Sequence, residues 1–96
     1  GYLYAIFSPT FPKHVKLGKS IEPSKRYSEY SNYNPNCDWQ FLYVSQKFFE
    51  DYTEAEKTLM ERLSKQKIYP TYNLEWYDSC HSQLIIDIIK ELENNK

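Results

Sequence analysis

The first eighteen residues constrain the fold of this chain most strongly, because they place two strand-like runs on either side of a proline-rich break. Residues 2–7 read YLYAIF, residues 8–12 read SPTFP, and residues 14–18 read HVKLG. Aromatic and β-branched residues favour strands, whereas two prolines so close together require a loop. The pattern therefore predicts an antiparallel β-hairpin at the start of the chain.

The hairpin predicts which side chains share a face of the sheet. With a loop over residues 8–12, Tyr4 lies directly opposite Lys16. Side chains alternate along a strand, so one face carries two tyrosines, a lysine and a glycine: Tyr2, Tyr4, Lys16 and Gly18. The other face carries Leu3, Ala5, Val15 and Leu17. The second face is thus expected to contact the core, and the first to present polar groups.

Two helices and a third strand follow the hairpin. Pro23 suits the first turn of a helix that runs to about residue 30. Residues 38–46 are rich in apolar residues and predict a third strand, and residues 50–65 predict a second helix. Each of these segments is expected to pack against the hairpin.

The end of the chain predicts a short edge strand and a final helix. Trp76 and Tyr77 fit the edge strand, and Asp78 or Ser79 fits the helix cap. The apolar stripe of the helix comprises His81, Leu84, Ile85, Ile88, Ile89 and Leu92. The order predicts an α+β domain with a small, mainly antiparallel, three-stranded sheet flanked by helices. We expect residues 1–96 to form one domain. Since it lacks an initial Met, we expect it to be excised from, or to act with, a larger protein.

Composition limits the partners of the chain. The net charge of −1 argues against a strong electrostatic hold on nucleic acid. Residues 1–36, however, carry five basic and two acidic side chains, against seven and eleven in residues 37–96. The first segment would suit an anionic ligand, although a solvated charged surface explains it too. Two cysteines, no signal-like N-terminus and no membrane-length apolar run predict an intracellular protein that does not insert into membranes.

Glu56 is the most informative residue of the second predicted helix. It falls on the apolar stripe of that helix, which comprises Tyr52, Ala55, Leu59 and Leu63. A carboxylate facing a core is costly unless it is paired, hydrogen-bonded or bound to a cation. A salt bridge, a half-exposed position and a metal site are therefore the alternatives for Glu56.

The order of these residues resembles the GIY-YIG nuclease superfamily. The first half-motif is GYLY at residues 1–4, and the second is Lys-Leu-Gly at residues 16–18. An arginine eight residues later, a lone helical glutamate and a late aromatic motif complete the set: Arg26, Glu56 and Asn73–Tyr77. A lysine in the second half-motif is typical of a branch common in phages and large DNA viruses. The resemblance covers about residues 1–78.

The resemblance implies a divalent-metal-dependent endonuclease that hydrolyses phosphodiester bonds in DNA, or in RNA. Glu56 would bind Mg²⁺ or Mn²⁺, Arg26 would hold the scissile phosphate, and Tyr4 would be the general base. Lys16 opposite Tyr4 would lower the pKa of the phenol, because an ammonium favours the phenolate. Gly18 would let a phosphate or the next segment approach the strand. The four catalytic side chains are expected around one cleft on one face of the sheet: Tyr4, Lys16, Arg26 and Glu56.

Other residues are expected to support the site or to bind nucleic acid. The supporting residues are Tyr2, Gly18, Tyr30 and Asn73, and the expected contacts to the DNA backbone are Lys13, Lys19 and Lys25. Two departures from the family pattern bear on leaving-group protonation, since Tyr30 and Met60 stand where histidines are common. A second hypothesis is therefore a weak or inactive module that binds nucleic acid or a partner protein. A flanking DNA-binding domain or a dimer partner would supply affinity to so neutral a chain.

Overall fold

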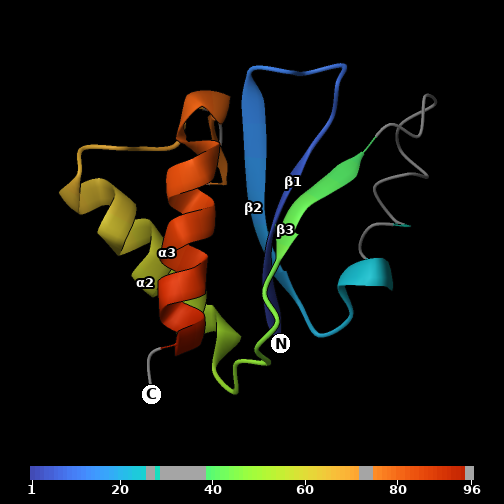
Figure 1. Ribbon diagram of the computed structural model, residues 1–96, viewed down its shortest axis with the longest axis vertical. Coiled ribbons are helices and arrows are strands. Elements are labelled where there is room, and N and C mark those ends of the chain that lie inside the picture. Colours follow the sequence, from blue (N-terminus) through green and yellow to red (C-terminus); the bar gives the residue numbers. More distant parts are fainter. Residues whose placement is uncertain (26–27, 29–38, 72–74, 95–96) are drawn as a thin grey trace.

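The computed structural model describes residues 1–25, 28, 39–71 and 75–94. In this part of the chain, an antiparallel sheet has two helices packed on one of its faces (Figure 1). The sheet has four strands in the order β3-β1-β2-β4. The strands are β1 (Tyr2–Phe7), β2 (His14–Ser20), β3 (Gln40–Val44) and β4 (Trp76–Asp78). The predicted α+β class is confirmed. The described sheet has four strands and not the predicted three, because the expected short edge strand, β4, pairs with β2.

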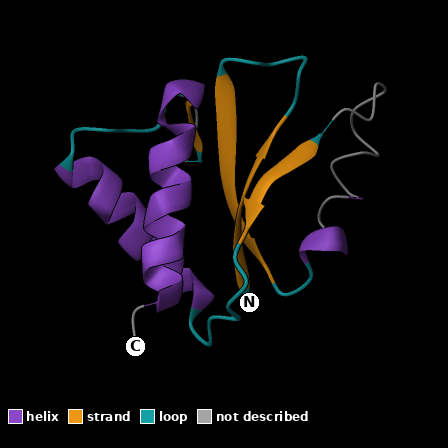
Figure 2. Ribbon diagram, viewed as in Figure 1, coloured by secondary structure: helices purple, strands orange, loops and turns teal. Residues whose placement is uncertain are grey.

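Two of the described helical segments begin at a capping side chain, and Figure 2 shows where the helices lie. Helix α2 (Tyr52–Lys65) is capped by Asp51, whose side chain accepts a hydrogen bond of 3.0 Å from the Glu54 amide. Asp78 caps the 3₁₀ turn η1 (Ser79–His81), accepting from the Cys80 amide at 2.9 Å. Helix α3 (Ser82–Asn94) follows η1 directly. Capping by Asp78 is thus confirmed, although a 3₁₀ turn comes before the predicted final helix.

The core lies between α2, α3 and one face of the sheet. The sheet contributes the side chains predicted for its apolar face: Leu3, Ala5, Val15 and Leu17, each fully buried. The helices contribute Leu59, Leu63, Ile85, Ile88 and Ile89. Burial of these side chains provides the main driving force for the fold, at about 1.5–3 kcal/mol for each large apolar side chain. The predicted division of the hairpin into two faces is confirmed.

The predicted register of the hairpin is wrong by two residues. Tyr4 pairs with Gly18, and Lys16 pairs with Ile6 rather than with Tyr4. The connecting loop is longer than expected, because it makes two successive backbone turns: Phe11 N–H donates to Ser8 O at 2.9 Å, and His14 N–H donates to Phe11 O at 3.1 Å. A shift of two residues leaves every side chain on its predicted face.

The first predicted helix is described only in part. Residues 23–25 are helical and lie on the side of the sheet away from α2 and α3 (Figure 1). Its predicted end near residue 30 lies outside the described residues, as does Asp38 at the predicted start of the third strand. That strand is shorter than the predicted 38–46, since β3 covers Gln40–Val44. None of the described helices combines the length and apolar character needed to cross a membrane.

Candidate active site

Glu56 is a buried carboxylate on the sheet-facing side of α2. It is 8% exposed, whereas Glu54 and Glu61 of the same helix are exposed. Leu59 and Leu63, three and seven residues further on, pack into the core and fix which side of α2 faces the sheet. The helix therefore carries Glu56 inward, as its place on the apolar stripe predicted.

Lys19 holds one oxygen of this carboxylate. The Lys19 ammonium donates to Oε1 of Glu56 at 2.7 Å, a length typical of a charge-assisted hydrogen bond. The other oxygen, Oε2, is buried and has no hydrogen-bond partner among the described residues. Leaving a buried acceptor unsatisfied costs about 1–3 kcal/mol. Only one of the two carboxylate oxygens of Glu56 therefore has a described partner. A cation or a hydrogen-bond donor beside Oε2 would lower the free energy of the buried carboxylate.

Lys19 thus has a contact that differs from the one expected. Its side chain is 31% exposed, and it lies opposite Leu3 on the core-facing side of the hairpin. The sequence contained a signal for this pair, because strand alternation places Lys19 on the same face as Leu17, and the helical pattern places Glu56 inward. A lysine and a glutamate that both face one core are natural partners.

Tyr77 is a second site residue that the sequence did not reveal. It pairs with Val15 across β2 and β4, is 1% exposed, and lines with Glu56 a cavity of about 490 Å³. Burial, and then the negative charge of Glu56, raise the pKa of the Tyr77 phenol. The phenol therefore keeps its proton at neutral pH and can act there only as a neutral donor or acceptor.

Gly18 provides room for the ring of Tyr4. A Cβ atom at Gly18 would lie 2.3 Å from Cζ and 2.4 Å from Oη of Tyr4. Gly18 has no positive φ and lies within β2, so its purpose is clearance and not a turn. The hairpin register explains the contact, since Tyr4 is directly opposite Gly18. The expected approach of a phosphate or of the next segment is thus replaced by a tyrosine of the same site.

Lys16 is engaged on the β4 side of the sheet. Its ammonium lies 3.7 Å from Oε2 of Glu75 and 5.8 Å from the centre of the Trp76 ring. It shares a face with Tyr4 but is not opposite it, because Ile6 occupies that position. The predicted position of Lys16 directly opposite Tyr4 is therefore wrong, whereas its predicted effect on the Tyr4 phenol stays a prediction.

Tyr4 and Glu56 lie on opposite faces of the sheet. Tyr4 is 1% exposed and packs edge-on against Phe41 at 5.5 Å, whereas Glu56 belongs to the helix-covered face. The predicted convergence on one face is therefore wrong. Residues 18–20 of β2 form an open edge of the sheet, where its two faces meet. The edge is open because β4 pairs only with His14–Lys16 and no other described strand pairs with this side of β2. Lys19 and Glu56 therefore lie on one side of this edge, and the hydroxyl end of Tyr4 lies over Gly18 on the other.

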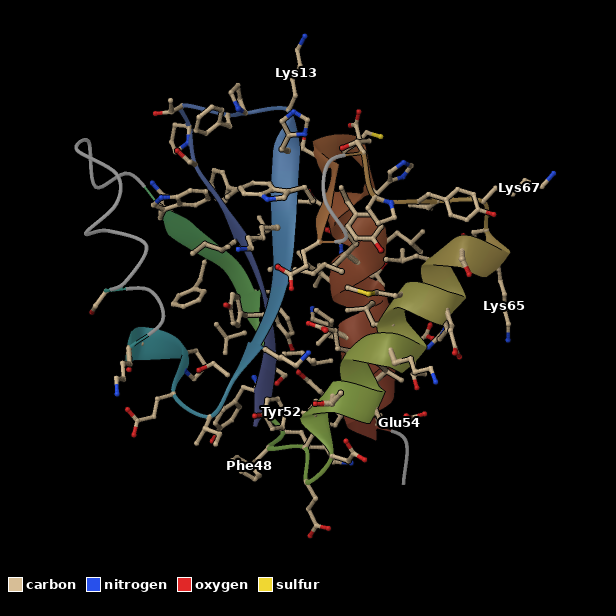
Figure 3. The ribbon with its side chains drawn as sticks, turned by 180° about the vertical axis from the view of Figure 1, so that it is seen from behind. Lys13, Phe48, Tyr52, Glu54, Lys65 and Lys67 are labelled. Carbon is tan, nitrogen blue, oxygen red and sulfur yellow. The ribbon has the colours of Figure 1, made fainter. Side chains whose placement is uncertain are left out.

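The remaining predicted residues are distributed as follows. Arg26, Tyr30 and Asn73 lie outside the described residues. Tyr2 is half-buried, and its ring packs edge-on against Phe48 at 5.4 Å. Lys13 and Lys25 are exposed, and Lys13 extends from the hairpin loop at one end of the molecule (Figure 3). The roles predicted for these residues stay predictions.

The metal ligands that this structure offers are few. Within residues 1–25, 28, 39–71 and 75–94, no group of three or more His, Cys, Asp or Glu side chains is placed to hold an ion. Within those residues, Glu56 would therefore bind a cation without a cluster of three or more such ligands. A single carboxylate with several waters suits Mg²⁺, which dehydrates reluctantly.

Comparison with known proteins gives one family. The chain is similar to the T5orf172 domain over residues 1–93, nearly its whole length. No curated protein and no solved structure matches it.

Proposed function

Since the chain belongs to the T5orf172 domain family, a phage-associated family related to GIY-YIG-like nuclease modules, we propose that it is a divalent-metal-dependent endonuclease domain acting on DNA. The observation that carries the proposal is the buried Oε2 of Glu56, which has no partner in the described part of the chain. A purely structural ion pair would be expected to satisfy both oxygens of so buried a carboxylate.

Glu56 would hold the divalent cation. Its Oε2 has no partner in the described part of the chain while Lys19 occupies Oε1, so a cation could bind there beside the ion pair once the side chains that cover Oε2 move aside. Mg²⁺ or Mn²⁺ would act there as a Lewis acid towards a phosphate and its attacking water. The low exposure of the carboxylate strengthens these electrostatic interactions, because little water screens them.

Lys19 would contact the phosphate itself. An ammonium has three donors, and one of them is used for Glu56. With a side chain that is 31% exposed, Lys19 can donate a second hydrogen bond to a phosphate oxygen at the edge of β2. In this position it would stabilise the negative charge that develops during hydrolysis.

The family resemblance implies proton removal by Tyr4 and phosphate binding by Arg26, although Tyr4 lies on the sheet face opposite Glu56. The hydroxyl end of Tyr4 lies over Gly18, at the edge that Lys19 reaches from the other face. A phenol with an ordinary pKa near 10 is a weak base, so proton removal by Tyr4 would depend on nearby positive charge. Arg26 would supply part of this charge and would bind the scissile phosphate bidentately.

A second candidate function is a module that binds nucleic acid without cleaving it. One observation favours it: the Lys19 ammonium already compensates the charge of Glu56, so the carboxylate is tolerated without a metal. In that case Lys19 and Glu56 would form a structural ion pair beside a DNA-binding edge.

A plasmid-nicking assay in Mg²⁺ or Mn²⁺ separates the two functions. Glu56→Gln keeps the shape of the side chain but removes its charge. Glu54→Gln is the matched control, because Glu54 is exposed on the same helix (Figure 3). We expect Glu54→Gln to nick like the wild type and Glu56→Gln to lose at least about a hundredfold in rate. Equal nicking by both variants would remove Glu56 from the mechanism, and DNA binding without nicking by any of the proteins would favour the binding module.

A further inference from the structure

An aromatic cavity lies on the same sheet face as Tyr4, near the loop end of the hairpin. Its volume is about 400 Å³, and its described lining consists of Phe11, His14, Trp39 and Trp76. This volume is within the range of about 300–1,000 Å³ that is typical of small-molecule sites. The cavity is separate from the Glu56 site, because His14 and residues 18–20 are at opposite ends of β2.

The aromatic rings of the cavity present flat apolar surfaces. The centres of the Trp39 and Trp76 rings are 5.7 Å apart, with the rings tilted by 48°. The His14 ring is nearly perpendicular to Trp76, at 87° and 6.4 Å. Phe11, which also lines the cavity, is 52% exposed. A planar ligand could therefore stack inside the cavity.

The cavity also has a polar atom without a described partner. Nδ1 of His14 is buried and makes no hydrogen bond within the part of the chain that the structure describes. Buried polar atoms nearly always have a partner, but this nitrogen has almost no exposed surface, so a ligand in the cavity could reach it only if the His14 ring turned. The described lining, made of four rings, thus suits a flat aromatic ligand.

Two lysines lie close to the cavity, and one of them, Lys16, is paired with Glu75. Lys13 precedes His14 and is exposed, and the Lys16 ammonium lies 5.8 Å from the centre of the Trp76 ring. A planar heterocycle attached to a phosphate matches both features. A nucleotide has this chemistry, and its base can enter the cavity only when it is unpaired, because pairing and stacking in a duplex cover both its edge and its faces.

We propose that this cavity binds an unpaired base of the nucleic acid strand on which the domain acts. The inference rests on the proposed function in taking nucleic acid as the partner. His14 and Gly18 are four residues apart, about 13 Å along β2, so one strand can contact both the cavity and the edge at Gly18. Stacking on aromatic side chains tolerates any base. The domain would therefore select single-stranded or distorted DNA without reading its sequence.

Tryptophan fluorescence reports on this cavity directly, since both tryptophans of the chain, Trp39 and Trp76, line it. The protein is titrated in EDTA, which prevents cleavage, with a short single-stranded oligonucleotide and with the same sequence as a duplex. Phe11→Ala removes an exposed ring that lines the cavity. Phe48→Ala is the matched control, because Phe48 is 51% exposed and lies at the end of the molecule opposite Lys13 (Figure 3).

We expect the single strand to quench the fluorescence and to bind at least about tenfold more tightly than the duplex. Phe11→Ala should weaken this binding at least about fivefold, as expected for loss of one stacking contact, and Phe48→Ala should change it less than about twofold. Equal binding of the duplex, equal effects of the two variants, or unchanged fluorescence would overturn the proposal. If the single strand quenches the fluorescence but no nicking occurs, the base-binding cavity is supported and the proposed hydrolysis is rejected. If the protein nicks DNA but Phe11→Ala binds like the wild type, the proposed hydrolysis is supported and the cavity is rejected.

Discussion

Replacing Gly18 with alanine tests the geometry of the site most sharply. The added Cβ would lie 2.3, 2.4 and 2.6 Å from Cζ, Oη and Cε1 of Tyr4, all closer than the 3.0 Å below which real contacts of this kind essentially never occur. Tyr4 is 1% exposed and packs against Phe41, so its ring cannot move aside without disturbing neighbours. Overpacking usually costs about 1–3 kcal/mol. With three ring atoms involved, we expect Gly18→Ala to lower the free energy of unfolding by about 3 kcal/mol.

A double-mutant cycle assigns this cost to Tyr4. Tyr4→Leu removes all three clashing atoms, so Gly18→Ala should cost less than about 1 kcal/mol in that background. The expected coupling is thus about 2 kcal/mol, well above the roughly 0.5 kcal/mol seen for independent sites. Urea unfolding followed by far-ultraviolet circular dichroism measures all four proteins. An equal cost of Gly18→Ala in both backgrounds would show that the Tyr4 ring does not lie over Gly18.

Two further predictions concern ionisable groups. Lys19→Met would leave both carboxylate oxygens of Glu56 without a described partner. It should lower the free energy of unfolding by about 1–2 kcal/mol, the lower part of the usual range because Lys19 is partly exposed. Glu56→Gln should recover part of that loss in urea unfolding, and an additive loss would refute the pairing. Burial, then the hydrogen bond and charge of Glu93, raise the pKa of Tyr43 to about 12. Because the unfolded state loses this proton near pH 10, stability should fall between about pH 10 and 12, and less steeply in Tyr43→Phe; parallel pH curves for the two proteins would contradict this.

The fold and the position of Glu56 could be predicted because they follow from periodicity. Strand alternation assigned Leu3 and Leu17 to the core, and the helical repeat turned Glu56 towards it. These patterns depend only on residue type and spacing, and they survive an error in the exact pairing of strands. Strand β4 was also predictable, since Trp76 and Tyr77 lie between a loop and a capping aspartate.

The partners within the site could not be predicted from the same patterns. The hairpin register depends on the two turns of the connecting loop, and no periodicity reveals the hydrogen bonds of these turns. The sequence therefore predicted Lys16 opposite Tyr4, whereas the structure places Gly18 there. The ion pair of Lys19 with Glu56 joins residues 37 positions apart and depends on how α2 crosses the sheet. Periodicity indicates which way a side chain faces, but packing decides what it meets.

The central claim is that Glu56 binds a divalent cation at the edge of β2, and paramagnetic broadening by Mn²⁺ tests it most directly. Mn²⁺ is added in substoichiometric amounts to the ¹⁵N-labelled protein and to Glu56→Gln. We predict that the amide signals of residues 18–20 and of Glu56 broaden first in the wild type and stay sharp in Glu56→Gln. Broadening centred on another carboxylate, such as Asp78 or Glu93, or the same broadening in both proteins, would contradict the account.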